Sequence, residues 1–152
     1  MKVSSTKFRG LKVYNGKTHL DNRGGFRELF IKRKIKGFQG IFWCMSKSKR
    51  NVVRGLHIQK KINQAKYVSV VKGKIFDVAL DLRKKSKTFG KYFAIILSDK
   101  NSKSIYIPKG LWFGFMGLKK SGSVIISLST HIFHKKEINR KNLKEIKFNW
   151  NS

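Results

Sequence analysis

Short runs rich in Val, Ile, Tyr and Phe follow one another along this chain without helical periods between them. The runs that read most clearly as strands are residues 66–71, 74–83, 92–97, 104–108 and 123–133. Glycines punctuate these runs, at Gly73, Gly90, Gly110 and Gly122, and the single proline is Pro108. Many short strands separated by turn residues favour an antiparallel sandwich or barrel. The sequence therefore predicts an all-β fold.

The run over residues 74–83 is the most informative of these strands. Side chains alternate between the two faces of a strand, so two sets of four are expected on opposite faces. The apolar set is Phe76, Val78, Leu80 and Leu82, and the second set is Asp77, Ala79, Asp81 and Arg83. We expect one core face and one polar face. Two carboxylates on one face are conspicuous in a chain with seven acidic residues, and they either serve a site or pair with Lys and Arg on a solvated face.

The length of 152 residues and the 40% content of apolar residues suffice for one buried core. We expect a single domain over residues 1–152. No stretch resembles a signal peptide or reaches the roughly 20 uncharged residues of a membrane span, so we expect a cytoplasmic protein without a membrane partner. Cys44 is the single cysteine, which excludes an internal disulfide and a cysteine zinc cluster and agrees with a reducing compartment.

The net charge of +29 raises the possibility of a nucleic-acid partner, because polyanions bind to Lys and Arg with release of counterions. Lysines supply most of this charge and occur in nearly every segment, whereas a nucleic-acid site would be clustered and mixed with Arg. We therefore favour a solvated, Lys-rich surface over a polyanion site, and nucleic-acid binding is the less favoured alternative. A small anionic substrate would still gain from the positive field.

The segment from Arg54 to Gln59 carries the first candidate site. If it is extended, His57 and Gln59 point to the same face, and a histidine beside an amide and near a cation such as Lys66 is a plausible acid/base centre. The alternative is a hydrogen-bonded structural histidine. A metal site would need a second histidine in place of Gln59 and a glutamate soon after, yet the next acid is Asp77. We predict no bound metal.

Six segments of the chain carry motifs that occur together in one family. Residues 21–28 fit D-x-R-G-x-F-x-E, residues 54–59 fit R-G-L-H-x-Q, residues 64–66 fit Q-x-K, residues 76–83 contain D-V-x-x-D-L-R, residues 86–90 fit S-x-T-F-G and residues 106–110 fit Y-I-P-x-G. In this order and spacing they resemble the dTDP-4-dehydrorhamnose 3,5-epimerase family, of which this chain looks like a divergent member.

The resemblance implies an antiparallel cupin barrel (a jelly roll, or double-stranded β-helix) that uses no metal or cofactor and is usually a homodimer. Its substrate would be a nucleotide-linked 4-keto-6-deoxy sugar, and its chemistry the removal of a proton beside the ketone, as in the biosynthesis of dTDP-rhamnose and of polysaccharides. By the same resemblance His57 is the base, Lys66 stabilises the enolate and Asp77 holds the polar array in position.

The resemblance also assigns residues that bind the substrate. Arg54 would meet the diphosphate as a charge-assisted fork, and Gln59 would lie beside the base. A further set comes from the early motif: Arg23, Phe26 and Glu28. In the family this segment helps to form the nucleotide site, often that of the partner subunit, so we expect the early strand to be exchanged or packed across a dimer.

Several positions depart from the family pattern. Phe113 stands where the family has an active-site histidine, Ser127 where it has a catalytic tyrosine, and Phe133 where it has a later tyrosine. The family also has a carboxylate near its carboxyl terminus that orients the histidine, and this chain stops at Ser152, before that segment. Asp77 or Asp81 could take over the orienting role.

A further departure concerns the expected base pocket. Phe42 and Cys44 occupy the positions of a Q-x-N pair that would read thymine, with Trp43 between them. The base is then held by stacking, or another nucleotide is used, or Phe42 and Trp43 simply fill the core. These losses leave two functions open: an epimerase, impaired or limited to one carbon, and a non-catalytic paralogue that binds a nucleotide sugar.

Overall fold

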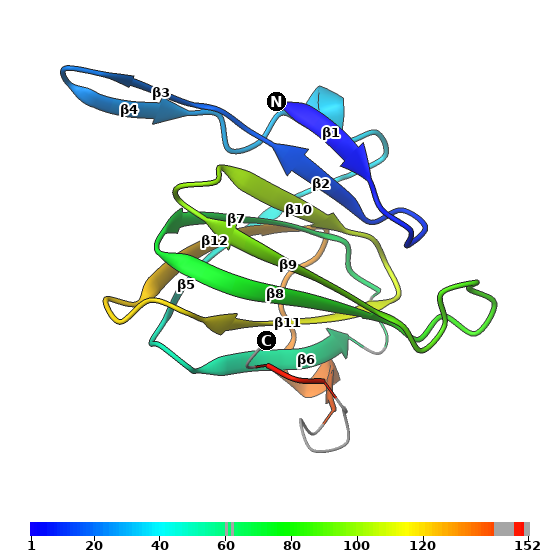
Figure 1. The fold of residues 1–152 in the computed structure, drawn as a ribbon. Helices are drawn as coiled ribbons and strands as arrows, with labels where there is room; N and C mark the ends of the chain where they lie inside the picture. Colours follow the sequence, from blue (N-terminus) through cyan, green and yellow to red (C-terminus); the bar gives the residue numbers. More distant parts are fainter. Residues whose placement is uncertain (60, 62, 142–147, 151–152) are drawn as a thin grey trace.

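In the computed structural model, residues 1–59, 61, 63–141 and 148–150 are described. They form a six-stranded sheet in the order β1-β2-β10-β7-β12-β5, a five-stranded sheet in the order β13-β6-β11-β8-β9, and the hairpin β3-β4 (Figure 1). The strands are β1 (Lys2–Ser5), β2 (Lys12–Asn15), β3 (Thr18–Asp21), β4 (Gly24–Arg27), β5 (Phe42–Ser48), β6 (Val53–Gln59), β7 (Lys66–Lys72), β8 (Lys74–Asp81), β9 (Tyr92–Ser98), β10 (Lys103–Ile107), β11 (Leu111–Gly117), β12 (Ser123–Ser129) and β13 (Ile138–Arg140). Two short 3-10 turns, Lys32–Lys34 and Lys135–Glu137, are the only helical segments in the described ranges. The pairings are antiparallel, which confirms the predicted all-β, antiparallel fold.

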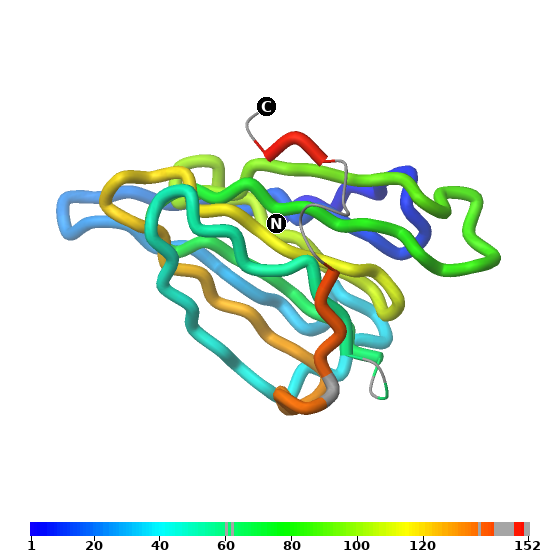
Figure 2. The backbone as a smooth tube through the Cα atoms, turned by 90° about the horizontal axis from the view of Figure 1, so that it is seen from below, coloured from blue at the N-terminus to red at the C-terminus, as the bar shows by residue number. Residues whose placement is uncertain are grey.

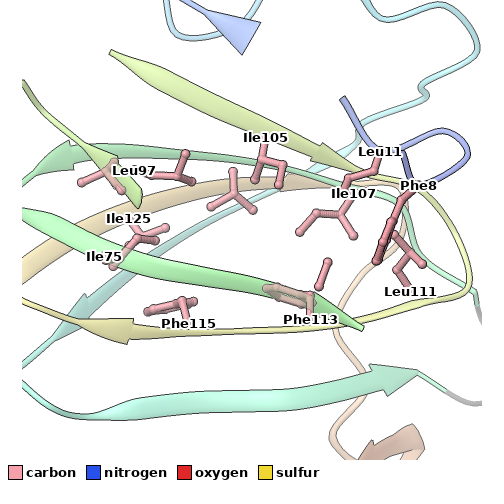
Figure 3. Packing of buried hydrophobic residues seen from close by; sticks show 13 residues of the cluster. Phe8, Leu11, Ile75, Leu97, Ile105, Ile107, Leu111, Phe113, Phe115 and Ile125 are labelled. Carbon is pink, nitrogen blue, oxygen red and sulfur yellow. The ribbon is translucent and has the colours of Figure 1, made fainter. Parts of the chain in front are cut away.

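The main core lies between the two large sheets. Buried side chains of β8 and β11 in one sheet, such as Ile75 and Phe115, meet those of β7, β10 and β12 in the other, such as Val70, Ile105 and Ile125 (Figure 3). This arrangement is that of a barrel whose wall consists of two sheets, with alternate side chains of each strand directed inward. The inner face of the barrel is therefore the place where side chains from both sheets can converge.

The turns predicted at glycines are confirmed. Gly73, Gly90, Gly110 and Gly122 all have positive φ angles, a conformation that costs glycine little and other residues more. At Gly73 a Cβ atom would lie 2.5 Å from the carbonyl oxygen of Gly122, so the turn between β7 and β8 also requires the absence of a side chain. These turns fix the order of the strands that carry the candidate site.

Of the two alternatives for the acidic face of β8, a site or a solvated face, the solvated face is contradicted. Ile75 to Asp81 are all buried, and both faces of the strand are covered. The face of Phe76 and Val78 packs against residues that include Phe148, whose ring centroid lies 5.7 Å from that of Phe76. Figure 2 shows residues 148–150, in red, running alongside the five-stranded sheet. The other face of β8 is directed into the barrel.

The hairpin β3-β4 extends away from the two sheets (Figure 1). Its apolar side chains Leu20 and Phe26 are 80% and 67% exposed. Large apolar side chains at such exposure on a protruding hairpin are typical of a segment that binds another surface.

As for membrane insertion, the described residues form no helix with the length and hydropathy of a membrane span.

Candidate active site

His57 lies on β6, opposite Phe113 of β11, and both side chains are directed into the barrel. The imidazole packs edge-on against the Phe113 ring, with 4.8 Å between the ring centroids. Burial, followed by the charges of Lys66 and Arg140, lowers the pKa of His57 to about 4. The imidazole is therefore neutral at neutral pH, and a neutral imidazole can accept a proton.

Lys66 enters the same space from β7, which belongs to the other sheet. Its Nζ atom lies 4.3 Å from the centroid of the Phe113 ring, so Phe113 contacts both His57 and Lys66. Burial lowers the pKa of Lys66 to about 8, against a smaller opposing effect of Cys44. Most Lys66 side chains are still protonated at neutral pH, and a half-buried ammonium group can stabilise a negative charge that develops beside it.

Both residues line a cavity of about 510 Å³ that opens between the sheets. Its wall combines side chains of β5, β7 and β12 from one sheet with those of β6, β11 and β13 from the other. The charged residues in the wall are Arg54, Lys66 and Arg140, and no described carboxylate lines it. A cavity with three cations and a neutral imidazole suits an anionic ligand.

Arg54 is held at one end of this cavity. Its Nε atom donates to the Ser48 hydroxyl at 2.8 Å and its Nη2 atom donates to the carbonyl of Lys47 at 2.9 Å. Both partners lie on β5, so these bonds tie β6 to the edge of the other sheet and fix the direction of the guanidinium group. An arginine that is oriented in advance loses less entropy when it binds a phosphate.

Gln59 lies deeper, where His57, Lys66 and Phe113 border a second, small space. The predicted shared face of His57 and Gln59 is confirmed. Gln59 is 6% exposed, and neither atom of its amide has a hydrogen-bond partner among the described residues. A buried amide that lacks partners is costly, and a bound ligand with polar groups would supply them.

Asp77 faces the barrel interior between Ile75 and Ala79, and it is fully buried. Burial raises the pKa of its carboxyl group to about 7. Neither oxygen makes a hydrogen bond within the part of the chain that the structure describes, so Asp77 is bonded neither to His57 nor to Lys66. The role of Asp77 in holding the polar array stays a prediction without a contact to support it.

Asp81, on the same face of β8, has its hydrogen-bond partners outside the cavity. Its side chain is 0% exposed and pairs with Arg83, with 2.8 Å between Nη2 and Oδ2. The hydroxyls of Ser86 and Thr88 also donate hydrogen bonds to its Oδ2 atom, at 2.6 and 2.7 Å. Burial raises the pKa of Asp81, but these hydrogen bonds outweigh burial and hold the pKa well below its usual range. Asp81 therefore stabilises the turn after β8 and does not orient His57.

The three residues expected to bind the nucleotide from the early motif lie outside this cavity. Arg23 and Phe26 belong to the exposed hairpin β3-β4 and Glu28 follows it. Arg23 forms an ion pair with Asp21 on the hairpin itself, at 2.7 Å. Within this chain they do not meet His57, so their role in binding remains a prediction.

The positions that depart from the family pattern do fall at the cavity. Phe113, Ser127 and Phe133 all line it, and Phe113 fills the space between His57 and Lys66. Of the expected base pocket, Cys44 lines the cavity. Trp43 is 52% exposed on the outer face of β5, near Phe30, so it does not stack on a ligand in this cavity.

Arg140, Ser46 and Ile138 line the cavity but were not expected from the sequence. Alternation along β5 could have placed Ser46 beside Cys44. Nothing in the sequence near Arg140 indicates that β13 would pair with β6 and bring Arg140 opposite His57.

For metals, no cluster of three or more His, Cys, Asp or Glu side chains occurs in the described ranges.

The sequence matches the profile of the dTDP-4-dehydrorhamnose 3,5-epimerase family over residues 5–152. The chain belongs to this family. A dTDP-4-dehydrorhamnose 3,5-epimerase from Methanothermobacter thermautotrophicus is 37% identical over 134 residues, which cover 85% of this chain and 71% of the relative. One from Mycobacterium tuberculosis is 37% identical over 70% of this chain and 56% of its own length. The chain thus spans little more than half of that mycobacterial relative.

Solved structures of dTDP-4-dehydrorhamnose 3,5-epimerase relatives have the same fold. The chain superposes with a TM-score of 0.92 on an epimerase from Legionella pneumophila that was crystallised with dTDP-4-keto-L-rhamnose. That protein is 30% identical, and the match covers 99% of this chain and 83% of the other. The family recognised from the motifs and the predicted cupin jelly roll are both confirmed.

Proposed function

We propose that this protein is an isomerase that epimerises a nucleotide-linked 4-keto-6-deoxy sugar, as its dTDP-4-dehydrorhamnose 3,5-epimerase relatives are named to do. The observation that carries the proposal is the pairing of a neutral imidazole with an ammonium group in one cationic cavity. His57 comes from one sheet and Lys66 from the other, and Phe113 contacts both. Each of the two groups has the protonation state at neutral pH that its role requires.

In the proposed reaction the His57 imidazole takes the proton from a carbon beside the ketone. The electrons of the broken C–H bond form the enolate, and the negative charge on its oxygen is stabilised by the Lys66 ammonium. Arg54 and Arg140 would hold the diphosphate, because charge-assisted bonds from arginine suit phosphate oxygens. The Gln59 amide would donate hydrogen bonds to the sugar and accept hydrogen bonds from it.

The test is proton exchange in deuterated water with dTDP-linked and other nucleotide-linked 4-keto-6-deoxy sugars, followed by NMR. We expect deuterium to enter at one or both carbons beside the ketone, and His57→Ala to lower the rate by about 10²-fold to 10⁴-fold. Asn139→Ala, on the neighbouring strand β13 but not in the cavity wall, is the control and should keep the wild-type rate. Folded protein that exchanges no sugar proton would refute the proposal.

The alternative of a non-catalytic nucleotide-sugar binder draws on the replacements at the cavity. Phe113 occupies space beside His57, and Ser127 is too short to act as a tyrosine would. This alternative predicts that a nucleotide sugar binds with equal affinity to the wild type and to His57→Ala, without exchange. Calorimetric titration of both proteins combined with the exchange assay distinguishes the two functions, because only the epimerase exchanges a sugar proton in the wild type and loses this exchange in His57→Ala.

We also propose a cytoplasmic homodimer in which the early segment, with its hairpin β3-β4, reaches across to the partner's cavity. The exposure of Leu20 and Phe26 on this protruding hairpin supports the proposal, and the free thiol of Cys44 is compatible with a reducing compartment. Mixing Phe26→Ala and His57→Ala chains, each of which we expect to be inactive alone, tests it. Mixed dimers would contain one intact cavity and regain activity, whereas no recovery after mixing and refolding would contradict exchange of the hairpin.

A further inference from the structure

Cys44 lies on the wall of the cavity that faces His57. Its strand β5 belongs to the six-stranded sheet, whereas β6 with His57 belongs to the five-stranded sheet. Along β5 the inward residues alternate with exposed ones, and Cys44 and Ser46 are the inward residues that line the cavity. A ligand between the sheets would therefore have the imidazole on one side and the thiol on the other.

The environment of Cys44 keeps the thiol in its acid form. Burial raises the pKa of Cys44, and the nearby Lys66 charge and a hydrogen bond with Ser127 oppose the effect of burial only in part. Ser127 is the direct partner of Cys44 across the β5–β12 pair. At neutral pH the thiol is thus protonated, and Lys66 is placed to stabilise the thiolate that would form if the proton left.

Other side chains of this wall are less suited to give up a proton. The hydroxyls of Ser46 and Ser127 are much weaker acids than a thiol, whose ordinary pKa is about 8.5. The Lys66 ammonium reaches across to Phe113, beside His57. A second feature indicates that a ligand binds here: the Gln59 amide, 6% exposed, has no partner among the described residues, and it borders the adjoining small space whose wall shares His57, Lys66 and Phe113 with the cavity.

We propose that Cys44 is the general acid that delivers a proton to the face of the sugar opposite His57. This inference rests on the proposed function. His57 removes the proton from the carbon beside the ketone, and the C–H electrons form the enolate. The Cys44 S–H bond then breaks, its proton bonds to the same carbon from the other face, and the enolate electrons restore the ketone. The imidazolium returns its proton to water and the thiolate takes one up, so the cycle closes without any other reactant.

The test separates two events in deuterated water, namely exchange at the sugar carbon and inversion of that carbon. Without Cys44, His57 can still remove the proton and return a deuteron to the same face. We expect Cys44→Ala to lower the rate of inversion by about 10²-fold or more and to keep exchange within about threefold of the wild type. Cys44→Ser, which keeps the side-chain size but is a weaker acid, should show the same split. Met45→Ala, next to Cys44 on the same strand but 65% exposed on the outer face, is the control and should leave both rates unchanged.

A Cys44→Ala protein that inverts the sugar at the wild-type rate would overturn the proposal. So would a Cys44→Ser protein that loses exchange and inversion equally while its melting temperature is unchanged, because that result indicates a role in shape or binding. If the wild type itself exchanges no sugar proton, the proposed function fails first, and the absence of His57-dependent exchange identifies that failure.

Discussion

Asp77 and Asp81 lie on the same face of β8, are equally buried, and should respond to the same substitution in opposite ways. The pKa of Asp77 rises from 3.8 to about 7, because the carboxyl group is buried without hydrogen bonds from the described residues. Each pKa unit corresponds to 1.36 kcal/mol, so this rise corresponds to a cost of about 4 kcal/mol for the ionised form. This cost lowers the stability of the folded chain only at pH values at which Asp77 is ionised in the unfolded chain.

The sign of the pH effect follows from linkage. Below about pH 4 the Asp77 carboxyl is neutral in both the folded and the unfolded chain and contributes nothing. Between about pH 4 and 7 the unfolded chain loses this proton first, so stability falls as pH rises, and above about pH 7 the full cost applies. Asp77→Asn should therefore raise the free energy of unfolding by up to about 4 kcal/mol at pH 8 and by much less at pH 5.

Asp81→Asn should do the reverse. The hydrogen bonds from Arg83, Ser86 and Thr88 hold the pKa of Asp81 below its usual range, so its contribution to stability is present above about pH 4 and is lost as pH falls. Removing the charge from this buried pair should cost roughly 3 kcal/mol at pH 8. The assay is urea unfolding at pH 5 and pH 8, followed by tryptophan fluorescence. An Asp77→Asn protein that is destabilised at pH 8 as much as Asp81→Asn would refute the reasoning.

Three further outcomes are expected from the geometry. Lys66→Met should lower the rate of exchange by about 10²-fold to 10³-fold, because the enolate loses the cation that stabilises it. The affinity for the nucleotide sugar should change little, and a loss of affinity alone would contradict this role. Arg54→Gln should weaken that affinity by about tenfold or more in calorimetric titration, with little change in exchange at saturation. Gly73→Ala should lower the free energy of unfolding more than Gly90→Ala does. Both glycines have positive φ angles, but only at Gly73 would the new Cβ atom meet backbone, with the carbonyl oxygen of Gly122 at 2.5 Å. Equal losses would contradict the packing argument.

Much of the fold and part of the site could be predicted from the sequence. Glycine punctuation and short β-rich runs predicted β7, β8, β9, β10 and β12, since turn chemistry and strand propensity are local properties, but they missed β11 and continued the last run to residue 133, past the end of β12 at Ser129. Alternation predicted that His57 and Gln59 share a face. Motif order identified the family, and through it Lys66 as a neighbour of His57 in space, although they lie on different sheets.

The failures come from contacts between distant parts of the chain. The sequence left open whether the acidic face of β8 is solvated, but that face is directed into the barrel and the apolar face is covered by residues 148–150. Arg140 could not be placed before the pairing of β13 with β6 was known. Cys44 was interpreted as part of a base pocket, and only the arrangement of the two sheets shows that it lines the same cavity as His57.

The proton transfer proposed for this cavity depends on a His57 imidazole that stays neutral. The most direct test is the pH dependence of deuterium incorporation into the sugar at substrate concentrations far below saturation, where the rate reports the ionisation of the ligand-free protein. Because burial and two neighbouring cations lower the pKa of His57 to about 4, the rate should stay nearly constant from about pH 7 down to about pH 5, and it should fall above about pH 8 as Lys66 loses its proton. A rate that falls about tenfold between about pH 7 and pH 5, as an ordinary imidazole with a pKa near 6.5 would cause, would contradict the account.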